Sequence, residues 1–182
     1  MGGMVSLWGA NSSIRSIQYV SVSSTTAAES VTIAAVNVAN TVVIALGPSS
    51  AYTPGNSPST SFATVNLVNS TTVTLAVMAT GGYSSTKKAV VIEFAPGVVK
   101  SVQSGIATIV NSTASATATI TGVNTAKTWI TMSTLTNADA GSVSGDWGAT
   151  STLTNATTIT FARETSAVSY YITCRFFAVE YF

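Results

Sequence analysis

The segment LVNSTTVTL at residues 67–75 recurs with few changes as LTNATTITF at residues 153–161. After the paired threonines, apolar residues occupy every second position, as at Val73 and Leu75 in the first copy. A period of two is the signature of a strand with one buried face. The segment therefore predicts β-structure, and it predicts the same β-structure twice.

Three other blocks recur in the same order, at offsets of 85 to 87 residues. They are SIQ (16–18) with SVQ (101–103), VNVANT (36–41) with VNTAKT (123–128), and VIEF (91–94) with AVEY (178–181). Because a repeat sets the architecture of a chain, we predict an arm at 1–13 and two units at 14–95 and 99–182. The turn-prone stretch at 95–97, Ala-Pro-Gly, separates the units. So short a connection predicts that they pack together as a pseudo-symmetric pair.

The residue types between the turns favour strands over helices. Thr and Val are abundant, and their branched side chains suit a pleated surface. Stretches rich in Gly, Pro and Ser break the chain at short intervals. We therefore expect an all-β fold of two tandem, internally duplicated antiparallel β-sandwich units, jelly-roll-like or immunoglobulin-like, with about six or seven strands each. A small barrel is the alternative for each unit. The last run, FFAVEYF (176–182), is expected to be paired within a sheet or interface.

The composition points to assembly. Only 7% of residues are charged, against about 25% in a typical soluble domain, and the formal net charge is +1. Such a surface lacks the repulsion that keeps monomers apart, so we expect a homo-oligomer or a permanently assembled subunit. A secreted Thr/Ser-rich β-protein is the alternative. The sequence has no apolar run of about 18 residues, so no membrane partner is expected.

The residues that commonly perform catalysis are scarce. The sequence contains no histidine, which removes the commonest general base and the commonest transition-metal ligand. Its one cysteine, Cys174, lies in an alternating segment and is expected to pack in a core. Glu93 and Glu180 occupy matching positions in the two copies, which favours a scaffold role over catalysis. We predict that the protein is not an enzyme and has no catalytic residues.

Ligand and nucleic-acid sites are equally poorly supported. Asp139 and Asp146 share a loop, but their spacing does not fit an EF-hand, so we predict no metal and no cofactor. The basic residues are scattered, whereas phosphate binding requires a concentrated patch. The adjacent pair Lys87 and Lys88 follows a Gly-Gly turn signal, and we expect both side chains in a solvated turn. We therefore expect no nucleic-acid partner.

The parts of the chain that differ between the copies are the candidates for partner contact. The arm has no counterpart before the second copy, and its apolar residues favour docking onto a neighbouring subunit. The two copies differ most at residues 47–66 and 134–152, and variable loops on a repeated scaffold commonly contact partners. Trp129 is expected in a strand and in the core. The candidate contact residues are Met4, Val5, Leu7, Trp8, Tyr52, Asp146 and Trp147.

The repeated pattern resembles that of small structural proteins of tailed bacteriophages. The resemblance lies in residues 101–103, 123–128, 153–160 and 179–181, with a looser first copy, and covers most of both copies. It implies a virion protein at the capsid surface, most simply a capsid decoration (cement) protein that binds and stabilises the lattice of the major capsid protein or other virion subunits. The alternative is a tail, neck or head-fibre component, or an adhesin that binds a host receptor or glycan through loops 47–66 and 134–152.

Overall fold

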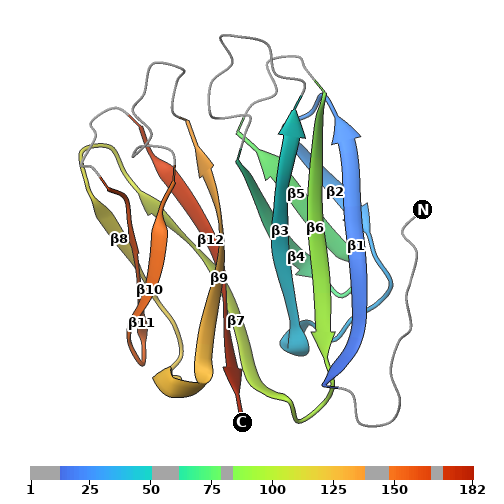
Figure 1. Ribbon diagram of the computed structural model, residues 1–182, viewed down its shortest axis with the longest axis vertical. Helices are drawn as coiled ribbons and strands as arrows, with labels where there is room; N and C mark the ends of the chain where they lie inside the picture. Colours follow the sequence, from blue (N-terminus) through green and yellow to red (C-terminus); the bar gives the residue numbers. More distant parts are fainter. Residues whose placement is uncertain (1–12, 51–61, 79–83, 138–147, 165–169) are drawn as a thin grey trace.

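The computed structural model describes residues 13–50, 62–78, 84–137, 148–164 and 170–182. Within these ranges the chain forms twelve strands, six from each copy, and two one-turn 3-10 helices (Figure 1). The first copy contributes β1 (Ile14–Ser24), β2 (Ala28–Thr32), η1 (Val38–Asn40), β3 (Thr41–Ser50), β4 (Ala63–Asn69), β5 (Thr72–Val77) and β6 (Ser85–Phe94). The second contributes β7 (Val99–Ile109), β8 (Ser115–Thr119), η3 (Thr125–Lys127), β9 (Thr128–Thr136), β10 (Thr150–Asn155), β11 (Thr158–Ala162) and β12 (Ile172–Tyr181).

Each copy folds into two three-stranded antiparallel sheets that face each other. Repeat 1 consists of sheet A, in the order β1-β6-β3, and sheet B, in the order β2-β5-β4. Repeat 2 has the same two orders, with sheet C as β7-β12-β9 and sheet D as β8-β11-β10. The all-β, duplicated sandwich arrangement predicted from the sequence is therefore confirmed. The last strand, β12, is the centre of sheet C, as its apolar sequence required.

Alternating side chains build a core inside each repeat. Val73, Leu75 and Val77 on β5 are all buried, and the residues between them are half-buried. On β11, Ile159 and Phe161 are fully buried in the same way. The period of two seen in the sequence is thus the period of sandwich packing.

The recurring LVNSTTVTL and LTNATTITF blocks are hairpins whose turns depend on asparagine. The Asn69 side-chain oxygen accepts a hydrogen bond from the Thr71 amide at 2.9 Å, and Asn155 accepts one from the Thr157 amide at 2.9 Å. The carbonyl of Thr71 then accepts from the Ile33 amide at 2.9 Å. Side chains of Asn and Asp stabilise turns by bonding to the backbone two residues on. The block is preserved in both copies because it both closes a hairpin and anchors the chain that follows the second strand.

The connection between the repeats is short. β6 ends at Phe94 and β7 begins at Val99, with Gly97 in the left-handed region at φ +82°. Phe94 and Tyr181, from the ends of the two repeats, meet edge to face with ring centroids 5.9 Å apart. The repeats therefore pack against each other near this connection (Figure 1).

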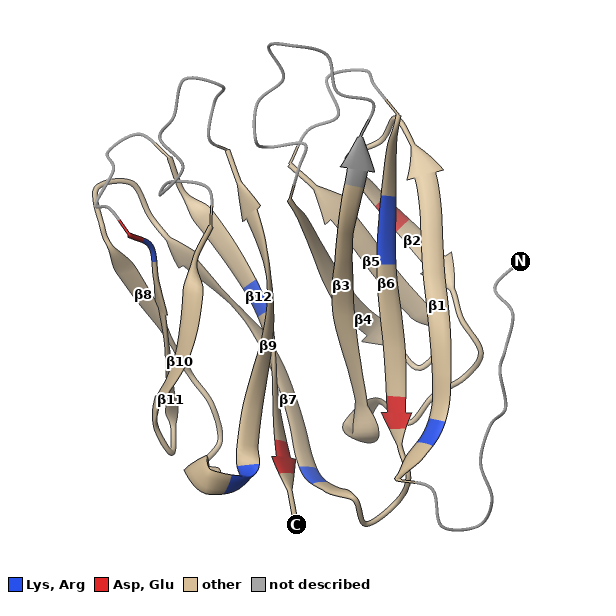
Figure 2. Ribbon diagram, viewed as in Figure 1, with Lys and Arg blue, Asp and Glu red and all other residues tan. Residues whose placement is uncertain are grey.

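One sequence prediction about the surface is wrong. Lys87 and Lys88 do not lie in a solvated turn, because both belong to β6 (Figure 2). Lys88 is exposed, whereas the Lys87 side chain points into repeat 1 and is 0% exposed. The Gly-Gly signal at 81–82 precedes the strand by several residues, so the turn chemistry does not extend to the lysines. Within the described ranges, the structure contains no helix long and apolar enough to span a bilayer.

Candidate interaction surfaces

The three remaining repeated blocks meet around a glutamate in each copy. In repeat 2, one Glu180 carboxylate oxygen accepts hydrogen bonds from the Asn124 amide at 2.8 Å and from Lys100 Nζ at 3.0 Å. The other oxygen accepts from Ser101 Oγ at 3.4 Å. The Asn124 side chain in turn accepts from the Ala126 amide and so begins helix η3. Three segments that are far apart in the sequence are thereby joined at one carboxylate.

Repeat 1 contains the same cluster. Glu93 accepts from the Asn37 amide at 2.9 Å, from Ser16 Oγ at 3.1 Å and from Arg15 at 3.2 Å. The side chain of Glu93 is 4% exposed and that of Glu180 is 2% exposed, while each cationic partner is more than half exposed. A buried carboxylate is stable only where donors satisfy it, and both sites supply a backbone amide, a hydroxyl and a cation.

The hydrogen bonds favour the charged form of these carboxylates. The Asn124 amide, followed by Lys100, lowers the pKa of Glu180 below its usual value. A carboxylate held in its charged form by several donors is a poor proton donor. This geometry supports the scaffold role predicted for both glutamates, because they bind the start, middle and end of each repeat together.

At the opposite end, each repeat buries a different cation beneath the loop between its first two strands. In repeat 1, Lys87 Nζ donates to Ser24 Oγ at 3.1 Å and to the Thr26 carbonyl at 2.9 Å. Burial lowers the pKa of Lys87, and nearby Glu29 acts in the opposite direction. The Glu29 carboxylate also accepts from the Thr26 hydroxyl. The loop is therefore held by one buried ammonium group.

In repeat 2 the cation is Arg163, which comes from β11's end and not from the strand that carries Lys87. Its guanidinium donates to the Thr113 carbonyl at 2.8 Å, the Tyr170 carbonyl at 2.7 Å and the Val110 carbonyl at 3.0 Å. The planar guanidinium has five N–H donors in a fixed fork, so it can satisfy these three carbonyls at once. Arg163 thus fixes the loop and the chain that enters β12 together.

The two repeats meet through non-equivalent surfaces, which departs from the pseudo-symmetric pair expected. Phe176 and Ala178 point into the core of repeat 2, but Phe177 and Val179 belong to the same buried cluster as Val43 and Val65 of repeat 1. The Val65 amide on β4 donates to Ser133 Oγ on β9 at 3.3 Å. The outer face of sheet C therefore covers the edge of repeat 1 where β3 and β4 lie, which we call the β3–β4 edge.

The structure places the two residues that were predicted to lie in a core, Trp129 and Cys174, in different surroundings. Trp129 is half-buried on the outer face of sheet C, and its indole donates to Tyr181 Oη at 3.2 Å, so it belongs to the contact between the repeats. Cys174 is fully buried inside repeat 2, as predicted. Burial raises the pKa of its thiol to about 12, so the thiol is unreactive at neutral pH.

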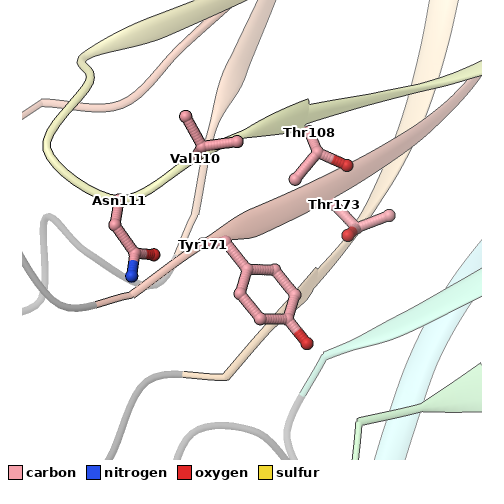
Figure 3. Close-up of a pocket in the computed structure, with 5 residues that line it drawn as sticks. All are labelled: Thr108, Val110, Asn111, Tyr171 and Thr173. Carbon is pink, nitrogen blue, oxygen red and sulfur yellow. The ribbon is translucent and has the colours of Figure 1, made fainter.

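A shallow, open hollow of about 530 Å³ lies beside β12 (Figure 3). Its lining residues are Thr108, Val110, Asn111, Tyr171 and Thr173. The Tyr171 hydroxyl reaches Met78 of repeat 1 at 3.5 Å, and its backbone amide donates to Asn137 at 2.8 Å. The hollow offers hydroxyls, one amide and one aromatic ring, which are groups that bind neutral polar ligands. No Asp, Glu, Lys or Arg side chain is among the described residues that line it.

The predicted contact residues lie outside the described part of the chain. Residues Met4, Val5, Leu7, Trp8, Tyr52, Asp146 and Trp147 are all in this category, as is Asp139. What the structure does place is the strand ends that flank them: β3 and β9 end, and β4 and β10 begin, at the end of the molecule opposite the connection between the repeats (Figure 1). The predicted loops 47–66 and 134–152 are too long, because their outer residues belong to these strands, but both segments start and finish on one side.

Within the described ranges, no group of three or more acidic, His or Cys side chains could hold a metal ion. Comparison of the chain with protein-family models, with curated proteins and with solved structures found no match.

Proposed function

We propose that this chain is a structural protein of a tailed-bacteriophage virion, and specifically a capsid decoration protein that binds the lattice of the major capsid protein. The observation that carries the proposal is the use of the outer sheet faces. One outer face, that of sheet C, already forms a contact between sandwiches. Apolar side chains remain exposed on the outer faces, including Tyr19 at 63% and Ile106 at 53%. Apolar patches on a nearly uncharged surface favour protein–protein contact.

The buried charges support a role in contact and not in catalysis. Glu93 and Glu180 bind backbone and hydroxyl groups of their own repeats, and Lys87 and Arg163 bind loop carbonyls. Each of these groups fixes the scaffold and is unavailable to a substrate. A rigid scaffold with its strand ends gathered on one side suits a protein that presents loops to a lattice.

The test is binding to capsids that lack the protein. Full-length chain is mixed with such capsids and sedimented, and occupancy is measured on electron micrographs. We expect regular density on the capsid surface and a higher capsid melting temperature. Deletion of residues 1–13 should abolish binding while the circular dichroism spectrum of the sandwich is retained. Full binding by the truncated chain would contradict docking through the arm, and absence from every capsid tested would contradict the decoration role.

A second candidate function is receptor or glycan binding by a tail, neck or head-fibre component. Two observations favour it: the clustered strand ends that flank loops 47–66 and 134–152, and the hollow beside Tyr171. In that case Trp147→Ala should reduce binding to host cells or to a glycan array without affecting particle assembly. Tyr171→Ala separates the hollow from the loops, because it removes only the ring that lines the hollow.

A further inference from the structure

The contact between the repeats uses the outer face of one sheet and the edge of one sandwich. An equivalent face and an equivalent edge remain unused. Within the chain, the outer face of sheet C packs on the β3–β4 edge. Because both repeats have the same strand order, repeat 1 has an equivalent outer face on sheet A, and repeat 2 has an equivalent edge at β9 and β10. The chain therefore carries two face-and-edge pairs, of which the internal contact uses one.

Equivalent residues show that the second edge is open. Val43 and Val65 on the covered edge are 1% and 2% exposed. Their counterparts on the β9–β10 edge, Ile130 and Ser151, are only half-buried although they occupy the same register. Among the described strands, β10 is hydrogen-bonded to β11 alone, so its other side also presents backbone groups.

The part of this face that stays open is apolar, although Val42 and Val90 on the same face are already buried at 0% and 8% exposed. Ile92 on β6 is the counterpart of Val179, which is 0% exposed in the internal contact, whereas Ile92 is half-buried. Around it on the outer face of sheet A lie Ile17 and Ile44, both half-buried, and Tyr19, which is 63% exposed. This face presents the kind of side chain that the internal contact buries.

We propose that a second copy of this chain occupies the remaining surfaces, so that the outer face of sheet A in one copy packs on the β9–β10 edge of another. Such a head-to-tail contact gives a closed ring if the rotation between copies closes, and a filament if it does not. The low charge of the chain favours it, since little repulsion opposes like copies. The proposal stands independently of the virion function, because it depends only on surfaces within the chain.

The new contact also differs from the internal one at the position of Ser133. Ser133, whose hydroxyl accepts from the Val65 amide, corresponds to Leu46 on β3, at the bulge between Ala45 and Gly47. Leu46 is 52% exposed. At this position the contact between copies is therefore more apolar than the contact within the chain, and it lacks that hydrogen bond.

The test breaks the face and the edge separately in the full-length chain. Tyr19→Lys places a charge on the face at an exposed position, and Ser151→Lys places one on the open edge, where the long side chain can bend outward. The matched controls are Thr32→Lys and Thr152→Lys, which add the same charge at exposed positions on sheet B and on the opposite side of β10. In sedimentation velocity, the wild type and both controls should associate with rising concentration, and each test variant alone should stay at the mass of one chain.

Mixing the two test variants gives the decisive result. Tyr19→Lys retains its edge and Ser151→Lys retains its face, so an equimolar mixture should form a complex of two chains and grow no further. A wild type that stays monomeric at its solubility limit overturns the proposal, as does association that both variants leave intact. Loss of association in both variants without recovery on mixing also overturns it, and indicates contact between identical faces or an occupant such as the arm.

A measurement on the wild type covers the possibility that Ser151→Lys fails to fold. Hydrogen exchange is compared between dilute and concentrated protein. We expect amides of β1 and of β10 to gain protection together on concentration. Protection gained by only one of these strands, or by neither, contradicts the head-to-tail contact.

Discussion

The two repeats use one hydrogen-bonding scaffold at one end and different solutions at the other. Glu93 and Glu180 bind matching sets of groups at nearly matching distances. The loop between the first two strands is instead held by Lys87 from β6 in repeat 1 and by Arg163 after β11 in repeat 2. The glutamate and the asparagine that donates to it have stayed the same between the copies, whereas the cation beneath the loop comes from a different part of each repeat.

The cores differ in the same compensating way. Val20 faces Ala89 across β1 and β6, and the equivalent pair in repeat 2 is Gly105 and Phe176. A Cβ atom on Gly105 would approach the Phe176 ring to 2.7 Å, so the large ring requires the glycine. The larger side chain is on the first strand in repeat 1 and on the last strand in repeat 2, while the pair fills the same space. Cores tolerate substitutions that conserve the total volume in this way.

The largest effect should come from breaking this pair. Phe176→Ala leaves a cavity and should lower the free energy of unfolding by about 3 to 4 kcal/mol. Gly105→Val forces the ring to move and should cost about 3 kcal/mol. The double variant recreates the repeat 1 pair, so its cost should be well below the sum. Urea unfolding of all three provides the double-mutant cycle, and strict additivity would show that the two side chains do not share one space.

The next effect concerns the buried cations. Arg163→Met removes three part-buried hydrogen bonds to backbone carbonyls and should cost about 2 to 3 kcal/mol. Lys87→Met removes two, and it also relieves the burial that opposes the Lys87 charge, so its cost should be less than about 1 kcal/mol. Thermal unfolding of the two variants compares them directly. Equal losses would contradict this difference between the repeats.

How far the sequence predicts this structure depends on the kind of residue. The repeated blocks contain Ser16, Asn37 and Glu93, whose hydroxyl, backbone amide and carboxylate form the glutamate cluster, so the duplication could be detected without a structure. The position of Lys87 could not, because a neighbouring turn signal competes with a strand pattern and only packing decides between them. The face-on-edge contact had one usable signal: residues 176–179 are consecutively apolar, which indicates a strand buried on both faces.

A smaller effect distinguishes the covered outer face from the open one. Val179→Thr places a hydroxyl in a fully buried contact and should cost about 1 to 2 kcal/mol. Its counterpart Ile92→Thr alters a half-buried position and should cost less in dilute protein. The two urea midpoints give the comparison. A larger loss at Ile92 would contradict the assignment of the covered face.

The smallest effect is a pH dependence. Because the folded state lowers the pKa of Glu180, the unfolded state binds more protons between that lowered value and the ordinary one near 4.5. The contribution of Glu180 is therefore present above the unfolded pKa and is lost as the pH falls through the folded one. Glu180→Gln should flatten this part of the acid stability curve, measured as urea midpoint against pH. An unchanged acid limb would show that the cluster does not depend on the charge.

Hydrogen exchange at the Val65 amide in dilute full-length protein tests the packing of the two repeats most directly. The amide lies on the outer side of an edge strand, where only Ser133 and the apolar face of sheet C separate it from water. We predict that it exchanges as slowly as amides at the centre of β5. Exchange at the rate of an exposed edge strand would show that the face of one repeat does not cover the edge of the other.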